Sequence, residues 1–246
     1  TSISVNNKHM NILQGKNAFI SGATGGIGKS VAHALVDSGC NLFLTSTNDK
    51  SLQEVIDSLS NKNVVVAGLS GDLNKIKDVY AIIKAAKAKF NSIDVLVNSA
   101  GIFPNFNLFD SDDDRFEETF NINFRSAFMF TREFAKGMVK NEWGRVVNIG
   151  SSSAYAGFGG TSMYCSSKHA LLGFSRAIHD ELKGSNVRTF CVSPSSTQSK
   201  MGKATIGQDY STFLKPDDIA KYVIFVISFN SNIMSEEIFL KRMIVQ

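Results

Sequence analysis

The chain has 246 residues, 43% of them hydrophobic, and its 26 Lys and Arg against 22 Asp and Glu give a formal net charge of +4. This length and composition suit one large domain with a substantial core. The charges are spread along the chain, so no basic stripe indicates a nucleic-acid partner.

Short apolar segments alternate with longer amphipathic ones, which indicates strand–helix–strand units and a parallel sheet. The expected strands are residues 17–21, 41–45, 64–69, 95–97, 146–149, 187–192 and 237–240. The expected helices are residues 27–38, which Gly39 should end, 51–59, 74–90, 115–121, 123–139, 162–183 and 217–228. About seven strands with six crossovers predict an α/β fold: a Rossmann-like, doubly wound parallel sheet with helices on both faces, forming one domain over residues 15–246.

Residues 1–14 are polar and lack the apolar core of a signal peptide, so we expect a flexible lead-in there. The apolar segment 222–229 is far shorter than the ~20 residues that span a bilayer. Three cysteines without a Cys-x-x-Cys spacing indicate reduced thiols, and the four histidines show no metal-ligand spacing. The acidic run 110–114 fits a solvated helix N-terminus better than a metal site. We therefore expect a cytoplasmic protein that binds neither a metal nor a membrane.

Notable motifs follow four of the expected strands, at residues 22–28, residues 98–101, Ser151 and Pro194. In an open parallel sheet, ligands bind outside the carboxyl ends of the strands. These motifs are therefore expected to share one site.

A glycine-rich turn follows the first strand, where residues 21–30 read Ser-Gly-Ala-Thr-Gly-Gly-Ile-Gly-Lys-Ser. Such glycines let the backbone approach a pyrophosphate bound at a helix N-terminus. A nucleoside-triphosphate P-loop is the rival interpretation, since Ala23 followed by Gly-Lys-Ser at 28–30 nearly matches it. That site also needs an acidic residue at a later strand end to help hold magnesium, and the strand ends carry none.

Tyr164 and Lys168 are four residues apart in an expected helix and therefore share one face. A free tyrosine has a pKa near ~10, and a neighbouring cation lowers it toward the working range of a proton donor. Ser151, or its neighbour Ser152, could hold the oxygen atom of a substrate.

Taken together, these residues resemble the short-chain dehydrogenase/reductase family, from about Gly15 to Val192 and more weakly beyond. The family's Thr-Gly-x-x-x-Gly-x-Gly motif begins here with Ser at position 21. Its Asn-Asn-Ala-Gly motif appears as Asn-Ser-Ala-Gly at 98–101. Its catalytic asparagine maps to Asn123, with Asn121 close by. Its serine and its Tyr-x-x-x-Lys map to Ser151, Tyr164 and Lys168.

The resemblance implies an oxidoreductase that interconverts a carbonyl and a secondary alcohol by hydride transfer, with a nicotinamide cofactor. In this scheme Tyr164 is the general acid/base and Ser151 orients the substrate oxygen. Lys168 grips the nicotinamide ribose and lowers the pKa of Tyr164, and Asn123 helps to hold a water relay. A non-catalytic dinucleotide-binding sensor or interaction protein on the same fold is the alternative.

The resemblance also implies the cofactor contacts. NAD-specific relatives place an acidic residue at the end of the second strand. This chain has Ser46 there, followed by Thr47 and Asn48, which could donate hydrogen bonds to a 2′-phosphate. We therefore expect NADP(H) rather than NAD(H). The expected contacts are Gly22, Gly25, Gly26, Ile27, Gly28, Ser46, Thr47, Asn48, Asp72, Leu73, Asn98, Ser99, Ala100, Gly101, Tyr164, Lys168, Pro194, Thr197 and Ser199.

Some positions depart from the family pattern. The usual Pro-Gly after the sixth strand is Pro194-Ser195, which raises a question about the backbone there. The short, polar segment 200–215 predicts a compact or polar small-molecule substrate. The last strand lacks the Gly-Gly of ketoacyl-carrier-protein reductases, so that activity is a minor alternative.

Phenylalanines mark two further surfaces. Phe103, Phe106 and Phe109 are expected either at the substrate mouth or in the packing of their loop. Family members commonly form homodimers or homotetramers through two long helices, here 123–139 and 162–183. The first of these carries apolar side chains that permit such an interface: Phe124, Phe128, Phe130 and Phe134.

Overall fold

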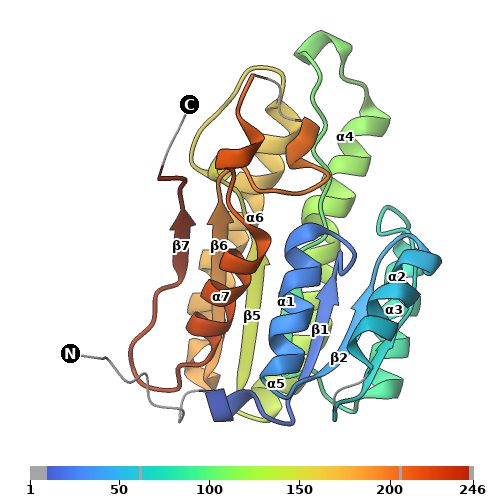
Figure 1. Cartoon of the computed structure of the whole chain (residues 1–246), viewed down its shortest axis with the longest axis vertical. Coiled ribbons are helices and arrows are strands. Elements are labelled where there is room, and N and C mark those ends of the chain that lie inside the picture. The colour runs from blue at the N-terminus through green and yellow to red at the C-terminus, as the bar shows by residue number, and fades with distance from the viewer. Residues whose placement is uncertain (1–9, 61–62, 205–206, 244–246) are drawn as a thin grey trace.

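The computed structural model describes residues 10–60, 63–204 and 207–243, and a seven-stranded parallel sheet forms its centre (Figure 1). The strands are β1 (Asn17–Ser21), β2 (Asn41–Thr45), β3 (Val66–Gly68), β4 (Val95–Asn98), β5 (Gly144–Ile149), β6 (Val187–Pro194) and β7 (Glu237–Leu240). Their order in the sheet is β3-β2-β1-β4-β5-β6-β7. The chain thus moves outward from β1 to β3, then crosses back to β4 and continues to the other edge. This arrangement confirms the predicted doubly wound, Rossmann-like fold.

Helices cover both faces of the sheet (Figure 1). They are α1 (Gly26–Asp37), α2 (Asp49–Leu59), α3 (Ile76–Lys89), α4 (Asp113–Phe120), α5 (Ser126–Lys140), α6 (Ser162–Leu182) and α7 (Pro216–Ile227). Apolar side chains of α1, α2 and α7 join one core cluster, and those of α3, α5 and α6 join a second. All six residues of β5 are buried, as expected for a central strand covered on both sides.

Local signals in the sequence explain where the elements begin and end. Gly39 ends α1 in the left-handed conformation (φ +81°), and its N–H donates to Val36 O at 2.9 Å. The helices expected at residues 115–121 and 123–139 form one continuous helical segment instead. A π-helical turn, Asn121–Arg125, joins α4 to α5. Such turns are often found at functional sites.

Part of the segment 1–14, which was expected to be a flexible lead-in, is packed on the domain. Residues 1–9 lie outside the described residues, but Met10–Leu13 form a 3-10 helix. Leu13 is fully buried in the core, and its carbonyl accepts a hydrogen bond from Cys40 Sγ at 3.2 Å. Among the described residues, no helix combines the length and apolar character required to cross a membrane.

The phenylalanines of α5 divide between the core and the surface. Phe130 and Phe134 are buried against Phe19 of β1, with ring centroids 4.7 and 4.9 Å away. These two rings, which the sequence left available for a subunit interface, are therefore part of the core instead. Phe128 is 38% exposed, because it lies on the opposite side of the helix.

Candidate active site

The glycine-rich turn after β1 packs too closely for side chains. Gly22 has φ +67°, and a Cβ there would lie 2.7 Å from Ala100 Cα in the segment after β4. A Cβ on Gly28 would collide with the carbonyl oxygen of Gly22. Helix α1 begins within this turn at Gly26, and its N-cap residue, Gly25, has no side chain that could bond to the first amides. The turn therefore offers backbone N–H groups at a helix N-terminus, which is the chemistry that a pyrophosphate needs.

The same turn does not support the P-loop interpretation. Ser30, which would hold magnesium, donates its hydroxyl to Asp217 Oδ1 at 2.6 Å. This bond links α1 to α7, so the hydroxyl already has a partner within the protein.

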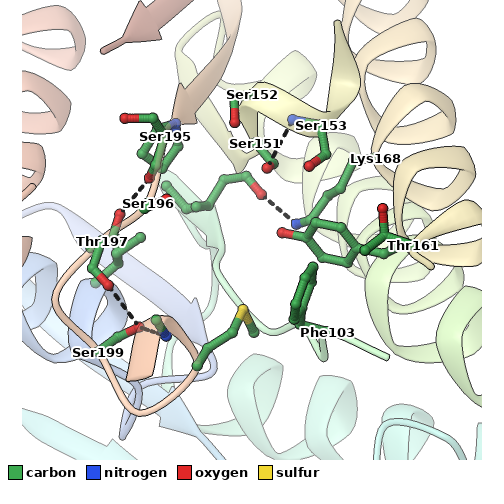
Figure 2. Close-up of a pocket in the computed structure, with 18 of the residues that line it drawn as sticks. Phe103, Ser151, Ser152, Ser153, Thr161, Lys168, Ser195, Ser196, Thr197 and Ser199 are labelled. Carbon is green, nitrogen blue, oxygen red and sulfur yellow. Dashed lines mark hydrogen bonds between the residues drawn. The ribbon is translucent and has the colours of Figure 1, made fainter. Parts of the chain in front are cut away.

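Lys168 and Ser151 line the same cavity, close to the carboxyl end of β5 (Figure 2). Lys168 is 5% exposed, and its Nζ donates to Ile149 O at 2.8 Å. Tyr164 lies one turn earlier in α6, with its ring centroid 5.8 Å from that nitrogen. Ser151 Oγ accepts from the Ser153 N–H at 3.1 Å, which orients the hydroxyl.

Burial governs the pKa values of this pair. Burial lowers the pKa of the Lys168 ammonium to about 8. Burial also raises the pKa of the Tyr164 phenol, and a hydrogen bond from Ser151 opposes that rise. The pKa of Tyr164 is therefore raised in this arrangement and not lowered as the resemblance implies, because burial is the largest influence on it.

Asn123 lies in the π-helical turn and joins two parts of the site. Its Oδ1 accepts from Ile102 N at 2.8 Å, and its Nδ2 donates to Ile102 O and Ser167 Oγ, both at 3.0 Å. The segment after β4 is thereby held against α6. Asn121 faces elsewhere, since its Nδ2 donates to Asn74 Oδ1 at 2.8 Å. The structure therefore favours Asn123 over its neighbour as the site residue.

The residues expected at the adenosine end have structural bonds of their own. Asn48 caps α2 by accepting from Ser51 N at 2.8 Å, and Ser46 Oγ donates to Asn48 O at 3.1 Å. Asp72 accepts from Asn74 N and pairs with Lys75 at 3.2 Å. Thr47 is exposed at the end of β2, and Leu73 is part of the core.

Asn98 has a position that its motif did not predict. Its Nδ2 donates to Asn148 Oδ1 at 2.7 Å, and Asn148 Nδ2 donates to Ser175 Oγ at 2.9 Å. This buried chain of polar groups connects β4 and β5 to α6. Asn98 does not line the cavity. The signal for such a role was an Asn at the end of one apolar strand and a second Asn next to the end of another.

The site is a cavity of about 350 Å³ between these elements (Figure 2). It brings together nine of the predicted site residues: Ile27, Ser99, Gly101, Ser151, Tyr164, Lys168, Pro194, Thr197 and Ser199. The other predicted residues lie outside its lining: Gly22, Gly25, Gly26, Gly28, Ser46, Thr47, Asn48, Asp72, Leu73, Asn98, Ala100 and Asn123. The lining residues that sequence reasoning missed include Ser153, Phe158, Thr161, Ser196, Met201 and Gln208.

The three loop phenylalanines have different environments. Phe103 lines the cavity and contacts the Tyr164 ring edge-on, with centroids 4.7 Å apart. Phe106 lies 4.2 Å beneath the Arg115 guanidinium, and Phe109 is 96% exposed. Only the first of them contributes to the cavity wall.

Ser195, which stands where the family pattern has Gly, does not disturb the backbone. Ser195 N donates to Leu240 O at 2.8 Å, which continues the pairing of β6 with β7. Its φ is not positive, since within the described ranges only Glu142 and Asn186 have positive φ among non-glycine residues. The position therefore does not require glycine.

Comparisons with known proteins agree on one family. The family model described as short chain dehydrogenase matches residues 16–209. The 3-oxoacyl-acyl-carrier-protein reductase FabG of Aquifex aeolicus is 30% identical, with 88% of this chain and 91% of the relative covered. The 2,3-dihydro-2,3-dihydroxybenzoate dehydrogenase of Bacillus subtilis is 31% identical over 88% of this chain and 90% of that protein.

Solved structures show the same fold. An alcohol dehydrogenase from Thermococcus sibiricus, complexed with 5-hydroxy-NADP, superposes with a TM-score of 0.85 at 24% identity, covering 94% of this chain and 97% of the other. A metagenomic short-chain oxidoreductase in complex with NADP gives 0.82 at 23% identity, covering 94% and 99%.

Proposed function

This chain belongs to the short-chain dehydrogenase/reductase family, and on that premise we propose that it is an NADP(H)-dependent oxidoreductase that interconverts a small carbonyl compound and a secondary alcohol. The observation that supports this activity is that three buried residues, Ser151, Tyr164 and Lys168, line one cavity. The glycine turn beside it has no room for side chains, which fits a bound pyrophosphate.

The cofactor, when bound, supplies or accepts the hydride. In the reducing direction Tyr164 donates its proton to the carbonyl oxygen, and in the reverse direction its phenolate takes the proton from the alcohol. Ser151 hydrogen-bonds the same oxygen and orients it. Lys168, charged below about pH 8, stabilises the phenolate that the proton transfer leaves behind. Asn123 keeps the wall of the site in place through its bonds to Ile102 and Ser167.

Replacing Tyr164 by Phe tests the proposed acid. The variant keeps the ring, including its contact with Phe103, and removes only the hydroxyl. We expect turnover with NADPH to fall roughly 10²–10⁴-fold, the usual contribution of a general acid, while the Kd for NADPH changes less than about twofold. Tyr155→Phe is the matched control, because its hydroxyl binds Glu237 at 3.0 Å and the residue does not line the cavity. Near-normal turnover in Tyr164→Phe would refute the assignment. NADPH binding without turnover on any tested carbonyl would favour the sensor alternative.

The preference for NADP(H) is inferred from the end of β2. Ser46 stands where an acid would repel a 2′-phosphate, and exposed Thr47 precedes the N-terminus of α2, whose dipole attracts anions. Asp49, the acid in the first turn of α2, accepts a bond from Ser70 Oγ at 3.3 Å. We expect Ser46→Asp to weaken NADPH binding at least about tenfold while NADH binding is kept, whereas Ser46→Ala changes the ratio of the two Kd values little. Equal affinities of the unmodified protein for both cofactors would contradict the preference.

Ketoacyl-carrier-protein reduction stays a second candidate because a relative at 30% identity carries that name. A ketoacyl thioester in the substrate panel distinguishes the two. Turnover of the thioester well above that of free ketones would favour this candidate.

We also propose a homodimer or homotetramer in the cytoplasm. Exposed Phe116, Phe128 and Val139 lie along α4 and α5, which offers apolar surface for a second copy. The three cysteines are free and buried, which suits a reducing compartment. Light scattering after size-exclusion chromatography would test the assembly, and a monomeric mass would contradict it.

A further inference from the structure

Arg242, in the segment after β7, contacts the loop that borders the cavity. Its Nη2 donates to Gln208 Oε1 at 2.7 Å and its Nη1 to Thr212 Oγ1 at 3.1 Å. The guanidinium also lies 5.0 Å from the ring centroid of Phe213, which is buried. The planar fork of arginine suits such a combined contact, because it donates at two points while its face stacks on a ring.

Gln208 transmits this contact to the cavity, which it lines together with Ser196. Its Oε1 accepts from Ser196 Oγ at 3.3 Å as well as from Arg242. Two donors on one oxygen determine which way the amide group faces, because the –NH₂ end could not accept either bond. The Nε2 group is left with two N–H donors that bond to no other residue within the described part of the chain. Figure 2 places Ser196 and Thr197 across the cavity from Phe103 and Thr161.

The base of this loop is held independently of Arg242. Leu214 N donates to Ser196 O at 3.0 Å, and Gln198 N donates to Leu214 O at 2.8 Å. The base of the loop therefore keeps these bonds when the guanidinium is removed, and what changes is the orientation of the Gln208 amide.

The charge of the cavity bears on what the amide recognises. Of the described side chains that line it, Lys168 is the only one with a formal charge, and it is bound to Ile149 O. A carboxylate placed near Gln208 would find a neutral amide donor, since Arg242 is already engaged. A neutral oxygen is the better match.

We propose that Arg242 is a positioning residue that orients Gln208 to donate a hydrogen bond to a second, neutral oxygen of the substrate. The substrate class is then a ketone with a hydroxyl or ether oxygen remote from the reacting carbonyl. This inference rests on the proposed carbonyl reduction.

The test compares a series of ω-hydroxy methyl ketones of increasing chain length with the methyl ketones in which a methyl group replaces the hydroxyl. NADPH oxidation is measured with the unmodified protein and with Arg242→Gln, Arg242→Lys, Gln208→Leu and Lys241→Gln. Lys241 is the matched control, because it is the adjacent cation and lies over the Phe239 ring, 4.8 Å from its centroid.

We expect the unmodified protein to prefer one hydroxy ketone over its partner roughly fivefold to tenfold in kcat/KM, the effect of one neutral hydrogen bond. Arg242→Gln and Gln208→Leu should lose this preference through a higher KM, with kcat and the Kd for NADPH little changed. Arg242→Lys should recover part of it, and Lys241→Gln should keep all of it. A merely structural role would lower kcat for both ketones alike.

Retention of the preference in Arg242→Gln or Gln208→Leu would overturn the inference, as would a stronger preference for keto acids in the unmodified protein. Failure of the proposed function looks different: the unmodified protein would oxidise no NADPH with any ketone, and this inference would fall with it.

Discussion

Replacing Lys168 by Met should make the protein more stable while it abolishes catalysis. The ammonium is 5% exposed, and burial lowers its pKa from 10.5 to about 8. Below the folded-state pKa, the folded protein must hold a buried charge that the unfolded chain keeps in water. Met has a similar length and no charge to bury, so the substitution removes that cost.

The size of the expected stability change follows from the pKa shift of Lys168. A difference of 10.5 minus about 8 is roughly 2.5 pKa units, and at 1.36 kcal/mol per unit it corresponds to about 3 kcal/mol. The variant also loses the bond from Nζ to Ile149 O, and an unsatisfied buried carbonyl costs about 1–3 kcal/mol. A net gain of about 1 kcal/mol at neutral pH remains, or about 2–4 °C in Tm for a domain of this size.

The pH dependence of stability distinguishes the buried charge of Lys168 from other causes of a stability difference. The pKa of Lys168 is lower in the folded state than in the unfolded chain. The buried charge therefore lowers the free energy of unfolding by its full amount below about pH 8, and the unmodified protein regains stability as the pH rises toward 10.5. The advantage of Lys168→Met should therefore shrink over that window. Urea unfolding from pH 7 to 10 measures it, with exposed Lys183→Met as the control. A variant that is less stable at pH 7, or a difference that is constant with pH, would refute the reasoning.

Two further predictions concern the scaffold. Gly22→Ala should lower the free energy of unfolding by at least about 2 kcal/mol, because φ is +67° and the new Cβ would lie 2.7 Å from Ala100 Cα. Gly173→Ala, where nothing lies within 4 Å, should raise it by about 0.5–1 kcal/mol, and thermal melts that rank these two variants in the opposite order would contradict the argument. Arg145→Met should lower the free energy of unfolding in urea by about 3 kcal/mol or more. Burial lowers the pKa of Arg145 to about 9, so removing the charge brings some relief, but the buried guanidinium donates to five acceptors, and each acceptor left unsatisfied costs about 1–3 kcal/mol. A loss below about 1 kcal/mol would show that these acceptors find other partners.

Much of the candidate site could be read from local spacing. The Tyr164–Lys168 pair needed only the helical period, and the turn containing Gly22 needed only the demand for positive φ and close approach. Both depend on neighbours in the chain, so the sequence carries their signal directly.

Other features depend on segments that are far apart in the chain. Asn98 matched a motif for cofactor contact, yet it is bonded to Asn148 in the buried interior. Sequence periodicity also did not separate Phe130, which is in the core, from Phe128, which is at the surface. The first outcome depends on which strands are neighbours in the sheet, and the second on which helix face meets the sheet.

The sequence by itself therefore determined the order of strands and helices, the glycine turn and the candidate catalytic residues, because local periodicity and motif spacing encode them. The tertiary structure alone decided that Tyr164 and Lys168 are both buried, which raises the pKa of the phenol and lowers that of the ammonium. It also decided that Arg242 reaches Gln208 across 34 positions of the chain. Desolvation and long-range hydrogen bonds arise only once distant segments have packed together, and no local pattern records them.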